Sequence, residues 1–194
     1  MHRHFLVYKP YKMVSQFITN DHKQKRKRFL GELHDFPANS MAVGRLDENS
    51  EGLIIITTNG KLSNQINKSA LWEKTYNVQL DGIVEESHLE KLKSCVTITV
   101  NSKAYTTKPC AVELIKQPTL RSTQQRIRDD RHGPTSWISI TITEGKFRQV
   151  RKMCAAVGLP VLRLVRVKIG QLDMGMMDEK VVIELDDSLL FNNY

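Results

Sequence analysis

A short polar loop around Asp47 contains the side chains with which this chain could do chemistry. The segment Gly44-Arg45-Leu46-Asp47 places a carboxylate beside a guanidinium, and a strongly apolar stretch follows at residues 53–58. Loops held by a rigid scaffold are frequent positions for catalytic groups, and a carboxylate can act there as a nucleophile or a base. The same residue types are common in ordinary turns, because their side chains bond nearby backbone groups. The loop alone therefore leaves both readings open.

A second group of side chains combines apolar and basic residues at helical spacing. At about 100° per residue, Phe147, Val150, Cys154 and Val157 form an apolar stripe, and Arg151 falls at its edge. A half-buried arginine needs a carboxylate partner, because an unpaired charge in that position is costly. The pattern predicts a helix packed on the core, with an arginine that pairs with an acid the pattern does not identify.

Tyr76 lies on a stretch whose alternation predicts a strand. Within residues 74–80, the side chains of Tyr76, Val78 and Leu80 share one face. A tyrosine in this setting either packs in the core with its hydroxyl satisfied at the rim, or offers a flat surface to a ligand ring.

Other elements are predicted on both sides of these groups. Strands are expected at residues 5–8, 13–18, 53–58, 74–80, 96–100, 111–115, 136–143, 161–168 and 180–185. Helices are expected at residues 29–33, at 61–67, after a capping box at 87–90, and at 147–157. Residues 117–133 read as a mobile basic loop. Strands and helices without regular βαβ alternation predict an α+β fold with a largely antiparallel sheet.

Composition restricts the class of partner. The chain has 194 residues, an apolar content of 40% and a formal charge of +8, which favours a polyanionic partner such as nucleic acid. No apolar run approaches the length of a membrane span, so no membrane association is expected. The three cysteines are widely spaced and form no CxxC pair, which predicts reduced thiols, no metal site and a cytoplasmic location.

Both chemical segments resemble signatures of one enzyme family. The loop at Asp47 resembles the GRLD motif of the pseudouridine synthases that modify ribosomal RNA, and residues 145–153 resemble their GRxRQVRRM motif. The resemblance extends from Tyr8 to about Gly170. It implies a bent mixed sheet flanked by helices, with a central catalytic cleft, in a single catalytic domain of two closely packed lobes over residues 1–194.

The resemblance also implies roles for individual residues. Asp47 corresponds to the catalytic aspartate and Arg151 to the arginine that pairs with it, while Tyr76 corresponds to the tyrosine that stacks on the flipped base and takes part in proton transfer. Leu164 corresponds to the apolar residue that floors the pocket. Substrate contacts are expected from Arg45, Leu164, Arg148, Lys9, Arg126 and Arg128. The basic runs at residues 23–28 and 121–131 would hold the phosphate backbone. Isomerisation of uridine oxidises nothing and imports no group, so no cofactor is expected.

Two further segments favour one branch of the family. Residues 133–137 and 158–164 look most like the large-subunit synthase E branch, which lacks the small S4 domain of related branches. The expected substrate is one uridine of large-subunit (23S) ribosomal RNA, free or in a pre-ribosomal particle, and the expected state is a monomer without an S4 domain. Three positions depart from the family pattern: Tyr8 stands where asparagine is usual, Lys12 or Met13 where glycine is usual, and Lys146 where arginine is usual.

Two other functions fit part of the pattern. A non-catalytic RNA-binding or ribosome-assembly protein would share the positive charge, but it would not need Asp47, Tyr76 and Arg151 at matching positions. A metal-dependent nuclease should show clustered carboxylates, whereas the acidic residues here are scattered.

Overall fold

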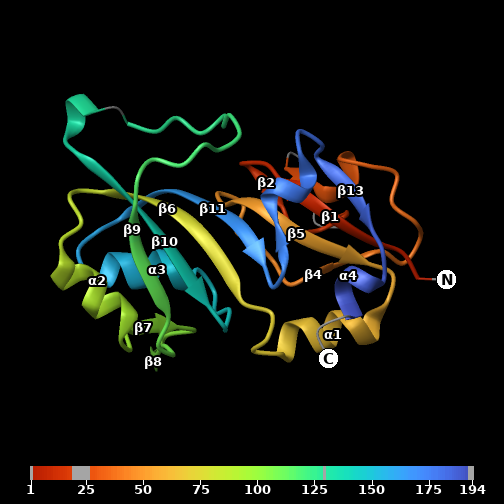
Figure 1. Ribbon diagram of the computed structural model, residues 1–194, viewed down its shortest axis with the longest axis horizontal. Coiled ribbons are helices and arrows are strands. Elements are labelled where there is room, and N and C mark those ends of the chain that lie inside the picture. The colour runs from red at the N-terminus through yellow and green to blue at the C-terminus, as the bar shows by residue number, and fades with distance from the viewer. Residues whose placement is uncertain (1, 19–26, 129, 192–194) are drawn as a thin grey trace. The chain divides into compact units, whose positions relative to one another are not determined.

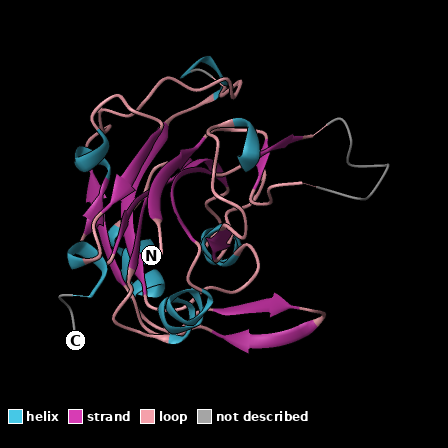
Figure 2. Ribbon diagram, turned by 90° about the vertical axis from the view of Figure 1, so that its right-hand side faces the viewer, coloured by secondary structure: helices cyan, strands magenta, loops and turns pink. Residues whose placement is uncertain are grey.

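The computed structural model describes residues 2–18, 27–128 and 130–191. By its contacts the chain divides into two compact units, which are Met1–Trp72 with Arg166–Tyr194, and Glu73–Val165. They are called unit 1 and unit 2 below. Strands make up most of the regular structure (Figure 2). None of the helices in the described ranges is long and apolar enough to cross a membrane.

Unit 1 is built on strands that pair mainly in antiparallel fashion (Figure 1). Its elements are β1 (His4–Lys9), β2 (Met13–Val14), β3 (Arg28–Phe29), η2 (Leu30–Glu32), β4 (Met41–Val43), β5 (Glu51–Thr57), α1 (Gly60–Lys68), β12 (Leu172–Asp173), η4 (Met174–Met177), β13 (Val182–Leu185) and α4 (Ser188–Phe191). Strand β1 pairs antiparallel with β5 and with β13, and β4 pairs antiparallel with β5. The short pair β2–β3 is parallel.

The core of unit 1 follows from its apolar strands. All seven residues of β5 are buried, as predicted for a strand covered on both faces. Phe5 and Val7 of β1 pack with Ile54 and Ile56 of β5 in one buried cluster. Helix α1 begins after Asn59, whose side chain accepts hydrogen bonds from two backbone N–H groups of the first turn, at 3.1 and 3.2 Å.

Unit 2 has a second set of strands with helices beside them (Figure 1). Its elements are β6 (Lys74–Asp81), α2 (Glu86–Lys93), β7 (Thr97–Val100), β8 (Lys103–Thr106), β9 (Ala111–Ile115), η3 (Asp130–His132), β10 (Thr135–Ile142) and α3 (Gln149–Ala156). Strand β11 (Val161–Ile169) begins in unit 2 and ends in unit 1. Strand β10 pairs antiparallel with β6 and β9, and β7 and β8 form a separate antiparallel hairpin.

The predicted fold class, α+β with a largely antiparallel sheet, is confirmed. Strand β6 alternates as expected, with Tyr76, Val78 and Leu80 buried. The basic run at residues 23–28 falls mostly outside the described residues. The described part of the predicted basic loop, residues 117–128 and 130–133, forms no strand, and its regular structure is confined to the short turn η3.

Three local predictions were wrong, and one strand was missed. The expected strand at residues 13–18 stops at Val14, because the chain bends after it. The expected cap at residues 87–90 lies two residues earlier, since helix α2 begins at Glu86 and Glu85 makes the reciprocal capping bonds with His88. Strand β8 was missed, although Asn101 and the residue after it both have positive φ, as two-residue hairpin turns require. Helix α3 begins at Gln149 rather than at residue 147.

Candidate active site

The loop that carries Asp47 is held by hydrogen bonds to its backbone. Gly44, at φ +70°, turns the chain out of β4, and the Leu46 side chain is buried. The Ser15 hydroxyl accepts a bond from Leu46 N–H at 2.9 Å and donates one to Leu46 C=O at 2.8 Å. Ser50 N–H donates to Asp47 C=O at 3.0 Å, which closes the turn before β5. The Asp47 side chain is half-buried at the end of a loop whose backbone is fixed on both sides.

Lys9 supports the same loop from below the surface. Its side chain is fully buried, and its ammonium donates to the carbonyl oxygens of Met13 at 2.7 Å, Pro10 at 3.0 Å and Glu48 at 3.4 Å. The predicted contact between Lys9 and substrate is therefore corrected, because the ammonium is enclosed and already bonded within unit 1. Lys9 joins the first turn of the chain to the residue that follows Asp47.

Burial also changes the acidity of Lys9. Desolvation lowers its pKa from the ordinary value of 10.5 to about 7, although the nearby carboxylates of Glu51 and Asp47 act in the opposite direction. Glu51 is itself buried and accepts a long bond of 3.5 Å from the Tyr8 hydroxyl. Charged side chains are thus enclosed beneath the Asp47 loop, where the low local polarity strengthens their mutual interactions.

Gly52 allows two strands of unit 1 to approach closely. It has a φ of +107°, and a Cβ at this position would lie 2.6 Å from the backbone nitrogen of Arg166. Arg166 is buried, and its Nε donates to the carbonyl oxygen of Leu53 at 2.6 Å. Only glycine fits this position without a clash against the Arg166 backbone.

Tyr76 and Leu164 are buried residues of unit 2. Tyr76 lies on β6, opposite Ile140 of β10, with 8% of its surface exposed. Leu164 lies on β11, the other neighbour of β6, and is 5% exposed. The strand positions agree with the expected elements.

Arg151 and Arg148 are placed differently by the start of helix α3. Arg151 lies within the helix, is half-buried, and its guanidinium donates to the carbonyl oxygen of Val161 at 3.4 Å. Arg148 precedes the helix in a left-handed conformation, at φ +54°. Val150 and Cys154 of the predicted apolar stripe are buried, but Phe147 is 65% exposed. The inclusion of Phe147 in that stripe was therefore wrong.

Glu144 organises the turn that leads into α3. Its carboxylate accepts hydrogen bonds from the Tyr105 hydroxyl, from Lys108 N–H at 2.9 Å and from Gln149 Nε2 at 2.7 Å. Burial by itself raises the pKa of Glu144, but these hydrogen bonds outweigh it, and the pKa is lowered. The hydrogen bond between the Tyr105 hydroxyl and Glu144 also raises the pKa of Tyr105. Sequence reasoning missed this group because Tyr105 lies 39 residues before Glu144 in the chain.

The basic loop between β9 and β10 uses its arginines in two ways. Arg126 is exposed. Arg128 forms an ion pair with Asp81 and donates to the carbonyl oxygens of Gly133 at 2.8 Å and Pro134 at 3.3 Å. Arg128 therefore ties the loop to the end of β6.

The predicted site residues fall in both units. Lys9, Arg45 and Asp47 belong to unit 1, where Arg45 is exposed. The others belong to unit 2, and these are Tyr76, Arg126, Arg128, Arg148, Arg151 and Leu164. Ser15 was missed by sequence reasoning, and its only signal was its place just after the first turn of the chain.

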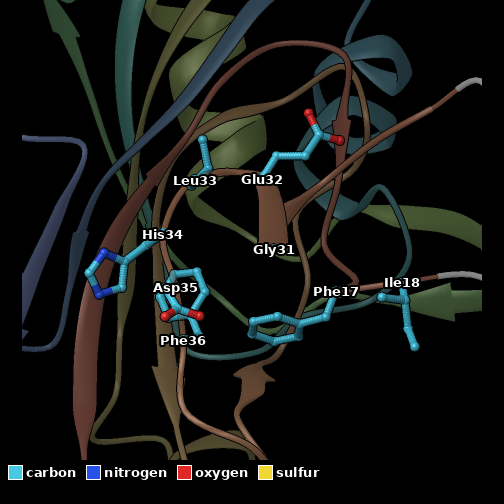
Figure 3. Close-up of a pocket in the computed structure, with 8 residues that line it drawn as sticks. All are labelled: Phe17, Ile18, Gly31, Glu32, Leu33, His34, Asp35 and Phe36. Carbon is cyan, nitrogen blue, oxygen red and sulfur yellow. The ribbon is translucent and has the colours of Figure 1, made fainter.

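A hollow of about 530 Å³ lies elsewhere on unit 1 (Figure 3). The rings of Phe17 and Phe36 meet edge to face there, with centroids 5.4 Å apart. The hollow contains none of the predicted site residues, and its lining consists of Phe17, Ile18, Gly31, Glu32, Leu33, His34, Asp35 and Phe36.

The comparison with known proteins supports the family that the Asp47 loop and the α3 segment resemble. Residues 3–156 match the family model described as RNA pseudouridylate synthase. The chain belongs to this family, and it is therefore an RNA pseudouridine synthase, an isomerase.

Individual relatives show which members of the family this chain is similar to. The chain is 40% identical to the ribosomal large subunit pseudouridine synthase E of Xanthomonas axonopodis pv. citri, over 85% of this chain and 84% of the relative. It is also 40% identical to the protein of that name from Vibrio parahaemolyticus, over 86% of this chain and 67% of the relative. The ribosomal large subunit pseudouridine synthase B of Salmonella typhi is 32% identical, over 84% of this chain and 51% of the relative.

Solved structures share the fold. A crystal structure of a pseudouridylate synthase has a TM-score of 0.74 and 27% sequence identity, and the match covers 98% of this chain and 73% of that one. A human protein, RNA pseudouridylate synthase domain containing 1, has a TM-score of 0.55 and 16% identity over 96% of this chain and 80% of its own. The second likeness concerns the fold alone.

Proposed function

We propose that this enzyme isomerises one uridine of large-subunit ribosomal RNA to pseudouridine. The observation that carries the proposal is the 40% identity with large-subunit synthases E over 85% of the chain. The position of Asp47 in a loop with a fixed backbone adds support, because the reaction needs a carboxylate at one defined place.

The chemistry explains why a carboxylate is central. The enzyme breaks the bond between N1 and C1′, turns the uracil and joins C5 to C1′, so every atom of the substrate is kept and no cofactor is required. The target base must leave its stack before this can happen. Asp47 then attacks C1′ or removes a sugar proton, and in both cases it acts on the electron-poor sugar, as carboxylates do in glycoside hydrolysis.

Unit 2 would supply the groups that hold the base and the aspartate. We propose that Arg151 pairs with Asp47 and keeps it ionised, because a nearby opposite charge favours the charged form. Tyr76 would stack on the uracil, and Leu164 would form the floor of the pocket. Arg45, Arg126 and Arg148 would bind phosphates. Lys9 and Arg128 are assigned to the support of the loops instead, because both already bond within their own units.

Several accompanying proposals concern the whole protein. The chain would act as a monomer and as a single catalytic domain, in the cytoplasm where ribosomes are assembled, on free RNA or on a pre-ribosomal particle. Mass measurement by light scattering tests the monomer. Comparison of naked RNA with isolated particles as substrates tests the form of the RNA.

Mapping of pseudouridines in ribosomal RNA tests the substrate. Cells without this protein should lose one pseudouridine in the large subunit, with small-subunit and transfer RNA unchanged. A plasmid copy of the wild-type protein should restore the site, and an Asp47→Asn copy expressed at the same level should not. Loss of a small-subunit or transfer RNA site would overturn the assignment of the substrate. An unchanged map, together with RNA binding by the purified protein, would favour a role in binding alone.

A further inference from the structure

Phe147 is displayed at the surface of unit 2 immediately before helix α3. It is 65% exposed, and it is the only aromatic residue among the mostly exposed large hydrophobic side chains in the described ranges. Single exposed apolar residues are ordinary on protein surfaces, so the exposure of Phe147 gains its meaning from the charged side chains beside it.

Two lysines near this turn lie over aromatic rings, Lys152 over Phe147 and Lys146 over Tyr105. The ammonium of Lys152 lies 5.1 Å from the centre of the Phe147 ring and donates to the carbonyl oxygen of Thr99 at 2.6 Å. The ammonium of Lys146 lies 4.7 Å from the centre of the Tyr105 ring. A lysine ammonium has three donors, so Lys152 keeps donors for an anion while it remains over the ring. Tyr105, Lys146, Phe147 and Lys152 are together called the Phe147 platform.

The Gln149 side chain fixes the backbone of the turn that carries Phe147. Gln149 is 3% exposed; its Oε1 accepts from Lys146 N–H at 2.9 Å, and its Nε2 donates to Glu144 at 2.7 Å. Gln149 N–H also donates to the carbonyl oxygen of Lys146 at 3.0 Å. Glu144 links the same turn to the β7–β8 hairpin through the Tyr105 hydroxyl. The backbone that carries the ring is therefore fixed before any partner arrives, which lowers the entropy cost of binding.

We propose that the Phe147 platform binds single-stranded RNA, with an unstacked base on the Phe147 ring and the neighbouring phosphates at Lys146 and Lys152. Aromatic rings beside cations suit this ligand, because every base offers a flat face and every linkage offers a charge. The net charge of +8 agrees with a polyanionic partner, and Glu144, the carboxylate in this group, is occupied by three internal hydrogen bonds. The assignment rests on the proposed function, in which RNA is the substrate, and it adds a contact for nucleotides other than the target.

Binding measurements with matched variants test the platform. The probes are an unstructured RNA of about ten nucleotides and the large-subunit transcript that contains the target. Phe147→Ala should weaken binding of the short RNA by roughly 5- to 150-fold, the range expected for loss of one stacked base. Phe147→Tyr keeps the ring and should bind as the wild type does, whereas Phe147→Leu keeps apolar area but should bind as weakly as Phe147→Ala.

A control variant separates stacking from general loss of apolar surface. Leu114 on β9 is 56% exposed in the same unit, and Leu114→Ala should bind both RNAs as the wild type does. On the transcript, Phe147→Ala should raise KM and leave kcat unchanged. Unchanged affinity of Phe147→Ala, full affinity of Phe147→Leu, or equal weakening by Leu114→Ala would each overturn the proposal.

The two proposals can fail separately. A wild-type protein that binds RNA but forms no pseudouridine in the transcript would defeat the proposed function, while the binding series on the short RNA would still report on the platform. A wild-type protein that modifies the transcript, with Phe147 variants that bind equally well, would defeat the platform alone.

Discussion

The Asp47 loop and the turn before helix α3 are both fixed by polar side chains, but the origin of those side chains differs. The Asp47 loop is held by Ser15, which bonds Leu46 from 31 residues away, and by Lys9, which bonds the Glu48 carbonyl from 39 residues away as well as two carbonyls close to it in the chain. The second turn is held mainly by Gln149, whose bonds to Glu144 and Lys146 span five residues or fewer. One loop therefore depends on tertiary structure, and the other mostly on its own sequence.

The two loops also present different groups. The first carries a half-buried carboxylate above an enclosed ammonium, whereas the second carries an exposed aromatic ring among cations. A carboxylate that acts on a bond must be placed accurately, because small misplacements cost much of the rate. A ring that stacks on a base contributes to affinity. Damage to the Asp47 loop should therefore lower kcat, and damage to the second turn should raise KM.

Replacement of Asp47 should have the largest effect. Asp47→Asn keeps the shape of the side chain but cannot act as nucleophile or base, so pseudouridine formation should be abolished while RNA affinity survives. Glu48→Gln is the matched control, because Glu48 is a neighbouring carboxylate that forms an ion pair with Lys27 at 2.7 Å, and it should retain turnover. Appreciable turnover by folded Asp47→Asn protein would end the assignment of Asp47.

Lys9→Met should show that the buried lysine beneath the Asp47 loop affects kcat. The variant keeps most of the side-chain volume but removes the ammonium donor from three backbone carbonyls, so the loop should shift, although the Glu48 carbonyl keeps a second donor, the Lys12 N–H. We expect kcat to fall by about 100-fold, with little change in RNA affinity. Lys61→Met, at an exposed lysine of α1, should behave as the wild type does. Thermal unfolding checks that each variant is folded at the assay temperature. A normal kcat for Lys9→Met would show that Lys9 is not needed to position the Asp47 loop.

The buried ammonium should also make stability depend on pH. The pKa of Lys9 is lowered to about 7 in the folded protein from 10.5. Between these values only the unfolded chain holds the proton, so the free energy of unfolding should rise with pH, by about 1.4 kcal/mol per unit for this group. Below pH 7 both states are protonated and the contribution is constant. Urea unfolding of wild type and Lys9→Met from pH 6 to 9 measures the difference, and a difference that stays flat above pH 7 contradicts the burial of the charge.

Gln149→Ala should loosen the turn before α3, and its smaller effect should fall on KM rather than on kcat. Loss of its side chain frees the turn, and the ordering that binding must then supply should raise KM by roughly 2- to 10-fold, with kcat unchanged. Gln79→Ala is the control, since Gln79 makes one long bond of 3.4 Å to Thr135 within the same unit. A fall in kcat for Gln149→Ala would break the proposed division between the two loops.

Arg126 and Arg128 should separate phosphate binding from support within one loop. Arg126→Ala should lower the slope of log affinity against log salt by about one unit and leave stability unchanged. Arg128→Ala removes the ion pair with Asp81 and two carbonyl contacts, so it should cost about 1 kcal/mol of stability. Salt titrations and denaturant unfolding measure both effects. Equal changes in salt slope for the two variants would show that Arg128 also contacts RNA.

Much of this protein follows from short-range patterns. The alternation in residues 74–80 predicted β6, the run of branched residues predicted the fully buried β5, and the residues around Asp47 and Arg151 indicated the family. These signals are local, because strand and helix periods appear within a few turns of chain. The pairing of Asp47 with Arg151 stays a prediction.

Tertiary structure decided which polar and aromatic side chains are enclosed. The sequence predicted a substrate contact for Lys9 and a place in the apolar stripe of a helix for Phe147, yet Lys9 is buried and Phe147 is exposed. Lys9 can be buried because three carbonyls converge on its ammonium, and Phe147 falls outside the helical stripe because α3 begins only at Gln149. The convergence of groups distant in the chain depends on the packed strands, and no local period encodes it.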